Sequence, residues 1–538
     1  MAVFQTFYMK KSIFILCILL MSIKSFSQTQ MVFNHNYPHE YYYTGNNMSI
    51  INQQYFIGGG IKLIDSTCEQ WCQGLHITQI NQDGELEEIK TISKCNWLLF
   101  NSINNFYAAS DNMFFFAGQE FSDTSQHNDL FFLKLNSDLD TLALQIFYED
   151  TLAKRAWNMC ETDNNGYAII GSIDSTRSEY FSPEIVKGQI LLVRIDSLGN
   201  QQWLNSYVIT NDIGLDTWQS GRHIIQTWDK GFIIAGLTYD FSSNDFLSFI
   251  MKVDSLGNYK WKRLFSAAPN DAPDIMDIME TKDSCYVICG AKNYGEVFGG
   301  LYPYDGWLYK FDTNGNYKWQ KTYREYHYDS GDWRDTIYCY FFSMAELEDG
   351  RIAVTGQVRK DAGIATTKPF MYLLSPQGDT IFSKYFCLYP QGHPDFVNES
   401  FPNKILCTED GGFAIGGWGV YIVWHEETQN WELPERIFLI KTDSLGNDGV
   451  VISYNGNTTV IDDFKLEIYP NPATDEFSFE LQTDIKTDIL EIYSTNGAVI
   501  CQQKIQAGTN KINIESLPVG MYLVRIRGEN LYGKFVKE

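Results

Sequence analysis

The chain has 538 residues, of which 44% are hydrophobic and 20% charged, values typical of globular proteins. Its 33 Tyr and 36 Phe favour an all-β fold, because flat side chains pack well on a pleated surface. The formal net charge of −25 would repel a phosphate backbone, so the composition argues against a nucleic-acid partner.

Residues 1–27 have the organisation of a secretory signal peptide. Lys10 and Lys11 precede an apolar run over 12–21, and Ser25 and Ser27 flank a cleavage point. Beyond this segment, no stretch approaches the roughly 18 uninterrupted apolar residues of a membrane span. The sequence therefore predicts an exported chain without a transmembrane span.

The cysteines do not form a compact disulfide scaffold. After Cys17 in the signal peptide, ten remain, an even number that is spread over the rest of the chain. Cys285 and Cys289 are four positions apart on one predicted strand, or roughly 13 Å, which is too far for a bond between them. The disulfide pairing stays open.

A short turn with Asp, Asn or Ser first and, in six of its seven copies, Gly fourth recurs along the chain, as in Asp254-Ser-Leu-Gly257. Its seven copies begin at Asn81, Asn136, Asp196, Asp254, Asp312, Ser375 and Asp443. The intervals range from 55 to 68 residues, which indicates a repeat architecture with loop insertions.

Upstream of every turn, an apolar strand ends on glycine. The seven glycines are Gly59, Gly118, Gly171, Gly236, Gly290, Gly356 and Gly417. A continuous apolar run suits a strand buried on both faces, and a terminal glycine permits a close backbone approach or an unusual turn.

Each copy holds four predicted strands: one before the apolar strand, the apolar strand itself, one before the turn and one after it. Four antiparallel strands per copy, without helical periodicity between them, predict the blades of a β-propeller. We therefore expect a seven-bladed β-propeller over 28–454, with a repeat of about 60 residues. Solenoid rungs would be shorter, and separate sandwiches would need about 100 residues each.

Three copies share the pattern D-x-x-G-x-x-x-W. These repeat-turn and docking residues are Asp196, Gly199 and Trp203; Asp254, Gly257 and Trp261; and Asp312, Gly315 and Trp319. The pattern resembles the tryptophan-docking blades of quinoprotein-like propellers. Asp229-Lys-Gly231 and Asp410-Gly-Gly412 resemble the repeats of secreted Bacteroidota propellers. We expect Asp to bond its own turn, Gly to take positive φ, and Trp to pack on a neighbouring blade.

After a linker over 455–465, a different pattern predicts a small Ig-like β-sandwich over 466–538. Its motif residues are Pro470, Asn471, Pro472, Gly497, Gly520, Tyr522 and Lys534. In this order they resemble the type A C-terminal sorting domain of the type IX secretion system. The resemblance implies that the secretion machinery is a partner and that the chain is secreted or held at the outer-membrane surface.

The sequence contains no zinc helix, nucleophile elbow, phosphate loop or dinucleotide motif, so neither catalytic residues nor a cofactor are predicted. Asp312-Thr-Asn314-Gly315 also fits a calcium loop but lacks the downstream bidentate Glu.

Two function classes stay open. The first is a propeller that binds a glycan or protein partner through its central channel or loops. Its loops have aromatic insertions at Tyr180–Val186, Tyr294–Tyr304, Tyr326–Asp335 and Val420–Trp431. The second is an extracellular glycan hydrolase, lyase or quinoprotein-like oxidase, which requires charged groups that converge at one end of the ring.

Overall fold

In the computed structural model, the described residues are 33–37, 42–43, 47–63, 72–94, 97–98, 106–108, 113–122, 127–138, 140–147, 152–174, 188–209, 217–240, 245–265, 273–293, 304–323, 338–359, 367–386, 388, 397–421, 423–425, 430–432, 435–448, 466, 468–481, 489–494, 499–526 and 532–538. All regular elements in these ranges are β-strands, so the all-β prediction is confirmed. The predicted signal peptide and linker lie outside the described residues.

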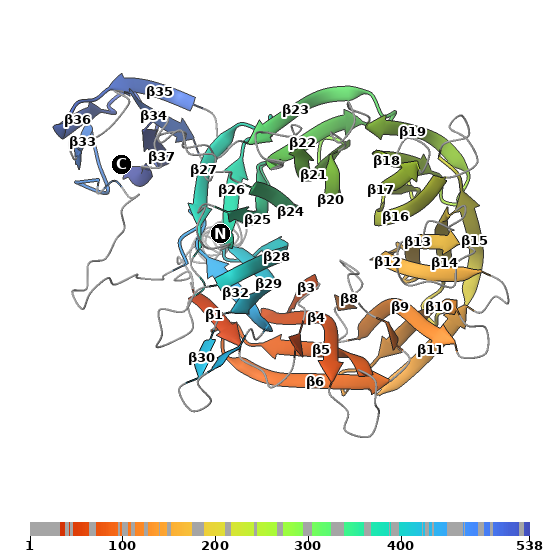
Figure 1. Cartoon of the computed structure of the whole chain (residues 1–538). Helices are drawn as coiled ribbons and strands as arrows, with labels where there is room; N and C mark the ends of the chain where they lie inside the picture. The colour runs from red at the N-terminus through yellow and green to blue at the C-terminus, as the bar shows by residue number, and fades with distance from the viewer. Residues whose placement is uncertain are drawn as a thin grey trace, which may run out of the picture.

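The large region consists of antiparallel sheets of four main strands each (Figure 1). In chain order the sheets contain β3 (Asn47–Ile51), β4 (Gln54–Leu63), β5 (Cys72–Ile80) and β6 (Leu86–Lys94); β8 (Phe106–Ala108), β9 (Phe114–Ser122), β10 (His127–Leu135) and β11 (Thr141–Phe147); β12 (Ala153–Glu161), β13 (Tyr167–Asp174), β14 (Gln189–Ile195) and β15 (Gln201–Tyr207); and β16 (Thr217–Gln226), β17 (Phe232–Asp240), β18 (Asp245–Val253) and β19 (Tyr259–Phe265). The short strands β2 (Tyr42–Tyr43) and β7 (Trp97–Leu98) pair with β4 and β9.

Two further units are joined by a single parallel pair between Tyr304 and Tyr338. They contain β20 (Asp274–Thr281), β21 (Cys285–Asn293), β22 (Tyr304–Asp312) and β23 (Tyr317–Tyr323), followed by β24 (Tyr338–Glu346), β25 (Ile352–Arg359), β26 (Thr367–Leu374) and β27 (Thr380–Tyr385). This arrangement of four-stranded units is consistent with a β-propeller.

The last of these sheets combines strands from both ends of the region. It contains β28 (Val397–Cys407), β29 (Phe413–Tyr421), β32 (Glu435–Thr442) and β1 (Phe33–Tyr37), and β30 (Val423–His425) pairs with β31 (Asn430–Glu432) beside it. β1 runs antiparallel to β32, with Phe33 opposite Lys441. The first strand among the described residues, β1, therefore takes the outermost place in this sheet.

The hydrophobic core lies between neighbouring sheets rather than within one of them. Ile170 of β13 packs in one cluster with Ile234 of β17, for example. Met48 of β3 shares a cluster with Ala414 of β29 and Leu439 of β32. The latter cluster joins the first sheet to the last one.

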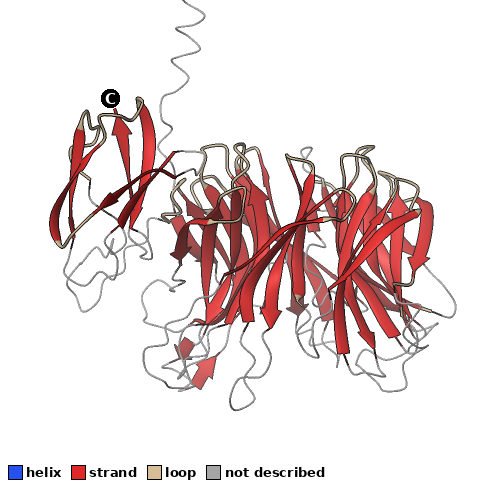
Figure 2. Ribbon diagram, turned by 90° about the horizontal axis from the view of Figure 1, so that it is seen from above, coloured by secondary structure: helices blue, strands red, loops and turns tan. Residues whose placement is uncertain are grey.

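Figure 1 shows the sheets around a central axis, with β3, β8, β12, β16, β20, β24 and β28 innermost. We call these the inner strands. Figure 2 shows that the tight turns gather on one face of the ring. Each inner strand runs toward that face, so its C-terminal end lies near the turns.

The C-terminal module has its own core, which includes Phe477, Ile512, Val524 and Phe535. In this module β33 (Glu476–Leu481) pairs with β36 (Gly508–Asn513), and a second sheet has the order β35 (Val499–Lys504), β34 (Ile489–Ser494), β37 (Gly520–Ile526) and β38 (Tyr532–Lys537). Arg525 donates from Nη1 to the carbonyl oxygen of Thr380, 3.0 Å away. The module therefore touches strand β27.

Candidate functional site

Each D-x-x-G turn is held by its own Asp. Oδ1 of Asp254 accepts hydrogen bonds from the amides of Leu256 and Asn258 at 3.1 and 2.8 Å, and Gly257 has φ +80°. Lys260 lies 3.0 Å from the same carboxylate. Although desolvation works against ionisation, these donors lower the pKa of Asp254 to about 2. Asp196 and Asp312 make the same two amide bonds.

The tryptophans of the pattern dock on the following copy and not on their own. A Cβ added to Gly257, Gly315 or Gly378 would meet the ring of Trp203, Trp261 or Trp319, in that order, at about 3 Å. Nε1 of Trp261 also donates to the carbonyl oxygen of Thr313 at 3.0 Å. The pattern therefore forms contacts between sheets as well as turns within them.

A second hairpin, between an inner strand and the next strand, contains a buried cation that the sequence analysis missed. Nζ of Lys252 on β18 is 2.7 Å from Oδ1 of Asp229, and the Lys252 side chain is only 4% exposed. Lys310 pairs with Asp283 and Lys441 with Asp410 in the same way. The signal is a Lys two positions before the Asp of the following D-x-x-G turn.

Contrary to the sequence prediction, the glycines of the apolar strands do not end these strands but lie within them, for example Gly290 within β21. Each of those described below lies opposite a distortion of the inner strand. The register shifts between Ala156 and Asn158 of β12 and, on β20, between Ile275 and Asp277. At this bulge, the carbonyl oxygen of Asp274 points at Gly290, and a Cβ there would lie within 3.0 Å of it. Equivalent contacts involve Gly171, Gly236, Gly356 and Gly417. These positions leave no room for a side chain.

At one register position the inner strands carry a ring of polar residues. On β12, β16, β20, β24 and β28 this position directly follows the bulge, and on β3, which pairs without a register shift, it is Asn47, opposite Gly58. The polar ring consists of Asn47, Asn158, His223, Asp277, Ser343 and Lys404. The last five each stand 13 positions before the glycine of the apolar strand. Asn105 has the same spacing from Gly118 but lies outside the described residues. This constant spacing is the sequence signal that could have revealed the ring.

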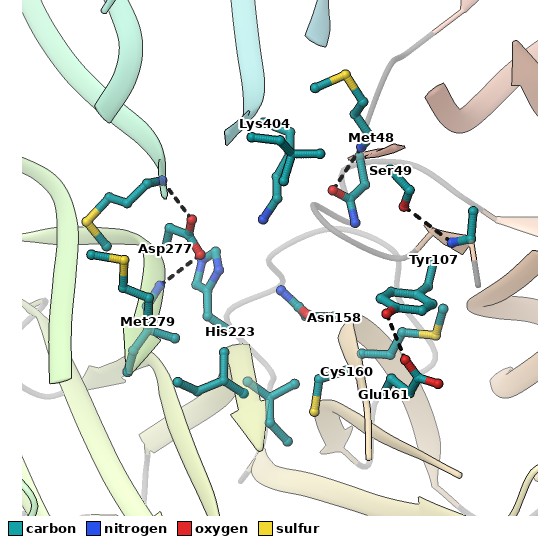
Figure 3. A pocket seen from close by; sticks show the side chains of 18 of the residues that line it. Met48, Ser49, Tyr107, Asn158, Cys160, Glu161, His223, Asp277, Met279 and Lys404 are labelled. Carbon is teal, nitrogen blue, oxygen red and sulfur yellow. Dashed lines mark hydrogen bonds between the residues drawn. The ribbon is translucent and has the colours of Figure 1, made fainter. Parts of the chain in front are cut away.

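The polar ring borders a cavity of about 530 Å³ at the centre of the sheets (Figure 3). All its members except Ser343 line the cavity, together with Tyr107, Cys160 and Glu161. This volume is within the range of about 300–1,000 Å³ that small-molecule sites occupy. The cavity is the candidate binding site.

Among the described residues that line the cavity, both carboxylates accept hydrogen bonds from protein donors. Oδ2 of Asp277 accepts from the hydroxyl of Ser343 and the amide of Met344, both at 3.0 Å. Oε2 of Glu161 accepts the hydroxyl proton of Tyr107 at 2.7 Å. Burial and this bond raise the pKa of Tyr107 well above its usual value.

His223 is 3% exposed, and its Nδ1 has no hydrogen-bond partner among the described residues. Burial lowers the pKa of His223 to about 4, against the attraction of Asp277. The ring is therefore neutral at pH 7. Arg222 and Lys404 also disfavour the charged ring, whereas the carbonyl group of Ile275 favours it.

The C-terminal motif residues hold the ends of the module together. The side chain of Asn471 accepts from the amide of Val536 at 2.9 Å, between Pro470 and Pro472. The hydroxyl of Tyr522 donates to the carbonyl oxygen of Pro518 at 2.7 Å, and Gly520 begins β37. Lys534 lies on β38. Gly497 lies outside the described residues.

In the part of the chain that the structure describes, no three His, Cys, Asp or Glu side chains form a group able to hold a metal ion. No helix there is long and apolar enough to cross a membrane. Cys285 and Cys289 are free thiols. Most of the four aromatic insertions lies outside the described ranges, so their placement stays a prediction.

Residues 467–538 match the family described as "Secretion system C-terminal sorting domain". The chain therefore carries a sorting domain of the type IX system at its C-terminus, as the motif order predicted. No curated protein matches the chain.

Several solved structures are similar to this chain at low sequence identity. The β-propeller domain of the Trilobed protease from Pyrococcus furiosus has 8% identity and a TM-score of 0.37, over 78% of this chain and 100% of that one. Drosophila Semaphorin 2a has 8% identity and a TM-score of 0.41, over 94% and 97%. An α-L-arabinofuranosidase from Fusarium graminearum has 9% identity and a TM-score of 0.37, over 62% and 91%. These similarities carry no functional argument.

Proposed function

We propose that this chain is an exported seven-bladed β-propeller that binds a glycan or protein partner outside the cell and admits part of that ligand to its central cavity. The sorting domain marks the chain for type IX export. The signal peptide over 1–27 would take it to the periplasm first. Export is thus supported independently of the binding role.

The blade count and closure of the ring rest on the contacts between sheets. Seven separate hydrophobic clusters each combine residues of two neighbouring four-stranded units. One of them joins Met48 and Ile57 of the first unit to Leu439 of the last. Pairing of β1 with β32 adds a backbone link at the same place. Together these contacts support seven blades in a closed circle.

The observation that carries the binding proposal is the polar ring around the 530 Å³ cavity. Apolar residues at these register positions would be the simplest way to fill a ring centre. Polar side chains instead recur at one position on six inner strands. Asp277 and Glu161 are both engaged by protein donors, an arrangement that suits recognition better than acid–base chemistry.

Export can be tested by removing 466–538 from the chain in a host that has the type IX system. The full chain should reach the medium or the cell surface, and the truncated chain should stay in the periplasm. Equal amounts of both outside the cell would contradict the type IX route.

Binding can be tested by screening the secreted protein against an array of acidic glycans, neutral glycans and peptides. A specific hit should lose binding when Asn158→Leu fills the cavity wall. The control is Gln82→Leu at an exposed position of the first D-x-x-G turn, which should leave binding unchanged. If Asn158→Leu binds the same ligand as strongly as the wild type, the binding site is on the loops and not in the cavity.

A further inference from the structure

Among the described residues that line the cavity, Lys404 carries the only ammonium group. It extends from β28 toward His223 and Asn158 in Figure 3. Its side chain makes no hydrogen bond or ion pair with any described residue. The residue is partly buried and its ammonium group has no anionic partner among the described residues, so it would attract a bound anion.

The carboxylate that would most readily neutralise Lys404 is engaged elsewhere. Asp277 accepts the hydroxyl of Ser343 and two backbone amides, those of Ile278 and Met344. These bonds orient its oxygens toward β24 and its own strand. Lys404 therefore keeps its donors for a ligand.

Two further polar groups near Lys404 lack partners. Nδ1 of His223 is buried and unpaired within the described ranges, as stated above. Asn158 is 4% exposed, and its side chain makes no hydrogen bond to a described residue. An amide and an imidazole can both donate to or accept from hydroxyl groups.

The charges of the cavity disfavour a ligand with more than one negative charge. One cation, Lys404, lines the cavity together with two carboxylates, Asp277 and Glu161, so a dianionic phosphate would be repelled more strongly than a single carboxylate that lies at Lys404. A single carboxylate needs only one cation, and neighbouring hydroxyl groups would use Asn158 and His223. A sugar acid has this combination of groups and fits the cavity volume of 530 Å³.

From this geometry we infer that the cavity binds the carboxylate of a sugar acid through Lys404, with Asn158 and His223 on its hydroxyl groups. The inference rests on the proposed binding function and names the ligand chemistry of the same cavity. A uronic acid unit at the end of a glycan would present both kinds of group.

The test is calorimetric titration of the full secreted chain at pH 7 with D-glucuronate, and with D-glucose as the neutral probe. Glucuronate should bind at least about 10-fold more tightly than glucose, because a charge-assisted hydrogen bond is worth that factor or more. Lys404→Met should weaken glucuronate binding by about 10- to 100-fold. Lys260→Met, which removes an exposed ammonium group on β19, should leave it unchanged.

His223 gives a second readout that does not depend on folding of a variant. Its ring resonances, titrated with and without glucuronate, should show a higher pKa in the complex, because a nearby anion favours the charged ring. Asp277, Arg222 and Lys404 face the ring in both states and are not altered in this comparison.

Equal binding of glucuronate and glucose, or full binding by Lys404→Met, would overturn the carboxylate inference and leave the binding function in place. No binding of either sugar would also overturn it. The array experiment then decides the proposed function separately, because it includes neutral glycans and peptides.

Discussion

The two hairpins of a blade use glycine for different reasons. In the D-x-x-G turn at the outer strand, Gly257 and Gly315 adopt positive φ near +80°, which other residues adopt at a cost. On β21, opposite the bulge of the inner strand, Gly290 has no positive φ, but the carbonyl oxygen of Asp274 occupies the place of a side chain. The turn glycine is needed because its own backbone has a positive φ. The strand glycine is needed because the bulge on the inner strand leaves no room for a side chain.

The inner bulge is also where the blades differ in chemistry. Outer turns repeat the same residues, whereas the position after each bulge carries Asn, His, Asp, Ser or Lys. A constant backbone distortion thus presents a variable side chain to the cavity. The residues that hold the fold and the residues that face the cavity therefore occupy different positions in each blade.

The largest effect is expected for Gly290→Ala, which forces a methyl group against the carbonyl oxygen of Asp274. We expect the free energy of unfolding to fall by about 3 kcal/mol or more, since relief requires the backbone to move. Chemical denaturation measures it. The matched control is Gly350→Ala, a turn glycine at φ +82° with no atom nearer than 3.6 Å to the added Cβ.

Gly350→Ala should cost about 1–2 kcal/mol, which reflects the left-handed conformation alone. Equal losses of stability would show that the clash with Asp274 adds nothing at Gly290. The proposed difference between the two kinds of glycine would then be wrong.

The next effect concerns the inner hairpin and its buried lysine. Asp229→Ala removes the bonds that Oδ1 accepts from Lys252, Thr227 and Gly231. Because the Asp229 side chain is largely exposed while Lys252 is 4% exposed, we expect a loss of about 2 kcal/mol. Asp229→Asn keeps the turn bonds and should lose about half of that.

The pH dependence of this pair has a definite sign. Desolvation opposes ionisation of Asp229, but hydrogen bonds from Lys252 and Thr227 lower its pKa overall. Its stabilisation is therefore present above the unfolded-state pKa and is lost as pH falls through the folded-state value. Thermal unfolding should show the gap between wild type and Asp229→Ala closing in acid; a constant gap would contradict this assignment.

The smallest effect concerns contacts between inner hairpins of neighbouring blades. Oε2 of Glu280 accepts the amide of Trp228 at 2.7 Å, and Gln226 accepts the amide of Asp163 at the corresponding place. Burial raises the pKa of Glu280. A raised carboxyl pKa favours the folded state below the unfolded-state pKa, and that contribution is lost as pH rises.

Glu280→Gln keeps the acceptor and removes the charge. It should therefore increase the free energy of unfolding at pH 7 by less than about 1 kcal/mol, which appears as a slightly higher melting temperature. Near pH 4 the melting temperature should be unchanged. Exposed Glu85→Gln serves as the control. A lower melting temperature at pH 7 would show that the charge itself holds the two blades together.

The sequence predicts the features that depend on local conformation. The Asp and Gly of each turn act within five residues, so their spacing was visible, and the C-terminal motif order identified the sorting domain. The docking partner of Trp261 was not visible, because Gly315 belongs to the next copy and only packing brings the two together. The polar ring was missed because its members share a position but not a residue type.

The most direct test of the account is a crystal structure of the secreted protein. It should show seven four-stranded blades, β1 as the outermost strand beside β32, and an open cavity bordered by Asn158, His223 and Lys404. A different blade count, a detached β1, or a cavity filled by side chains from the connecting segments would contradict the central claim that the inner strands form a ligand site.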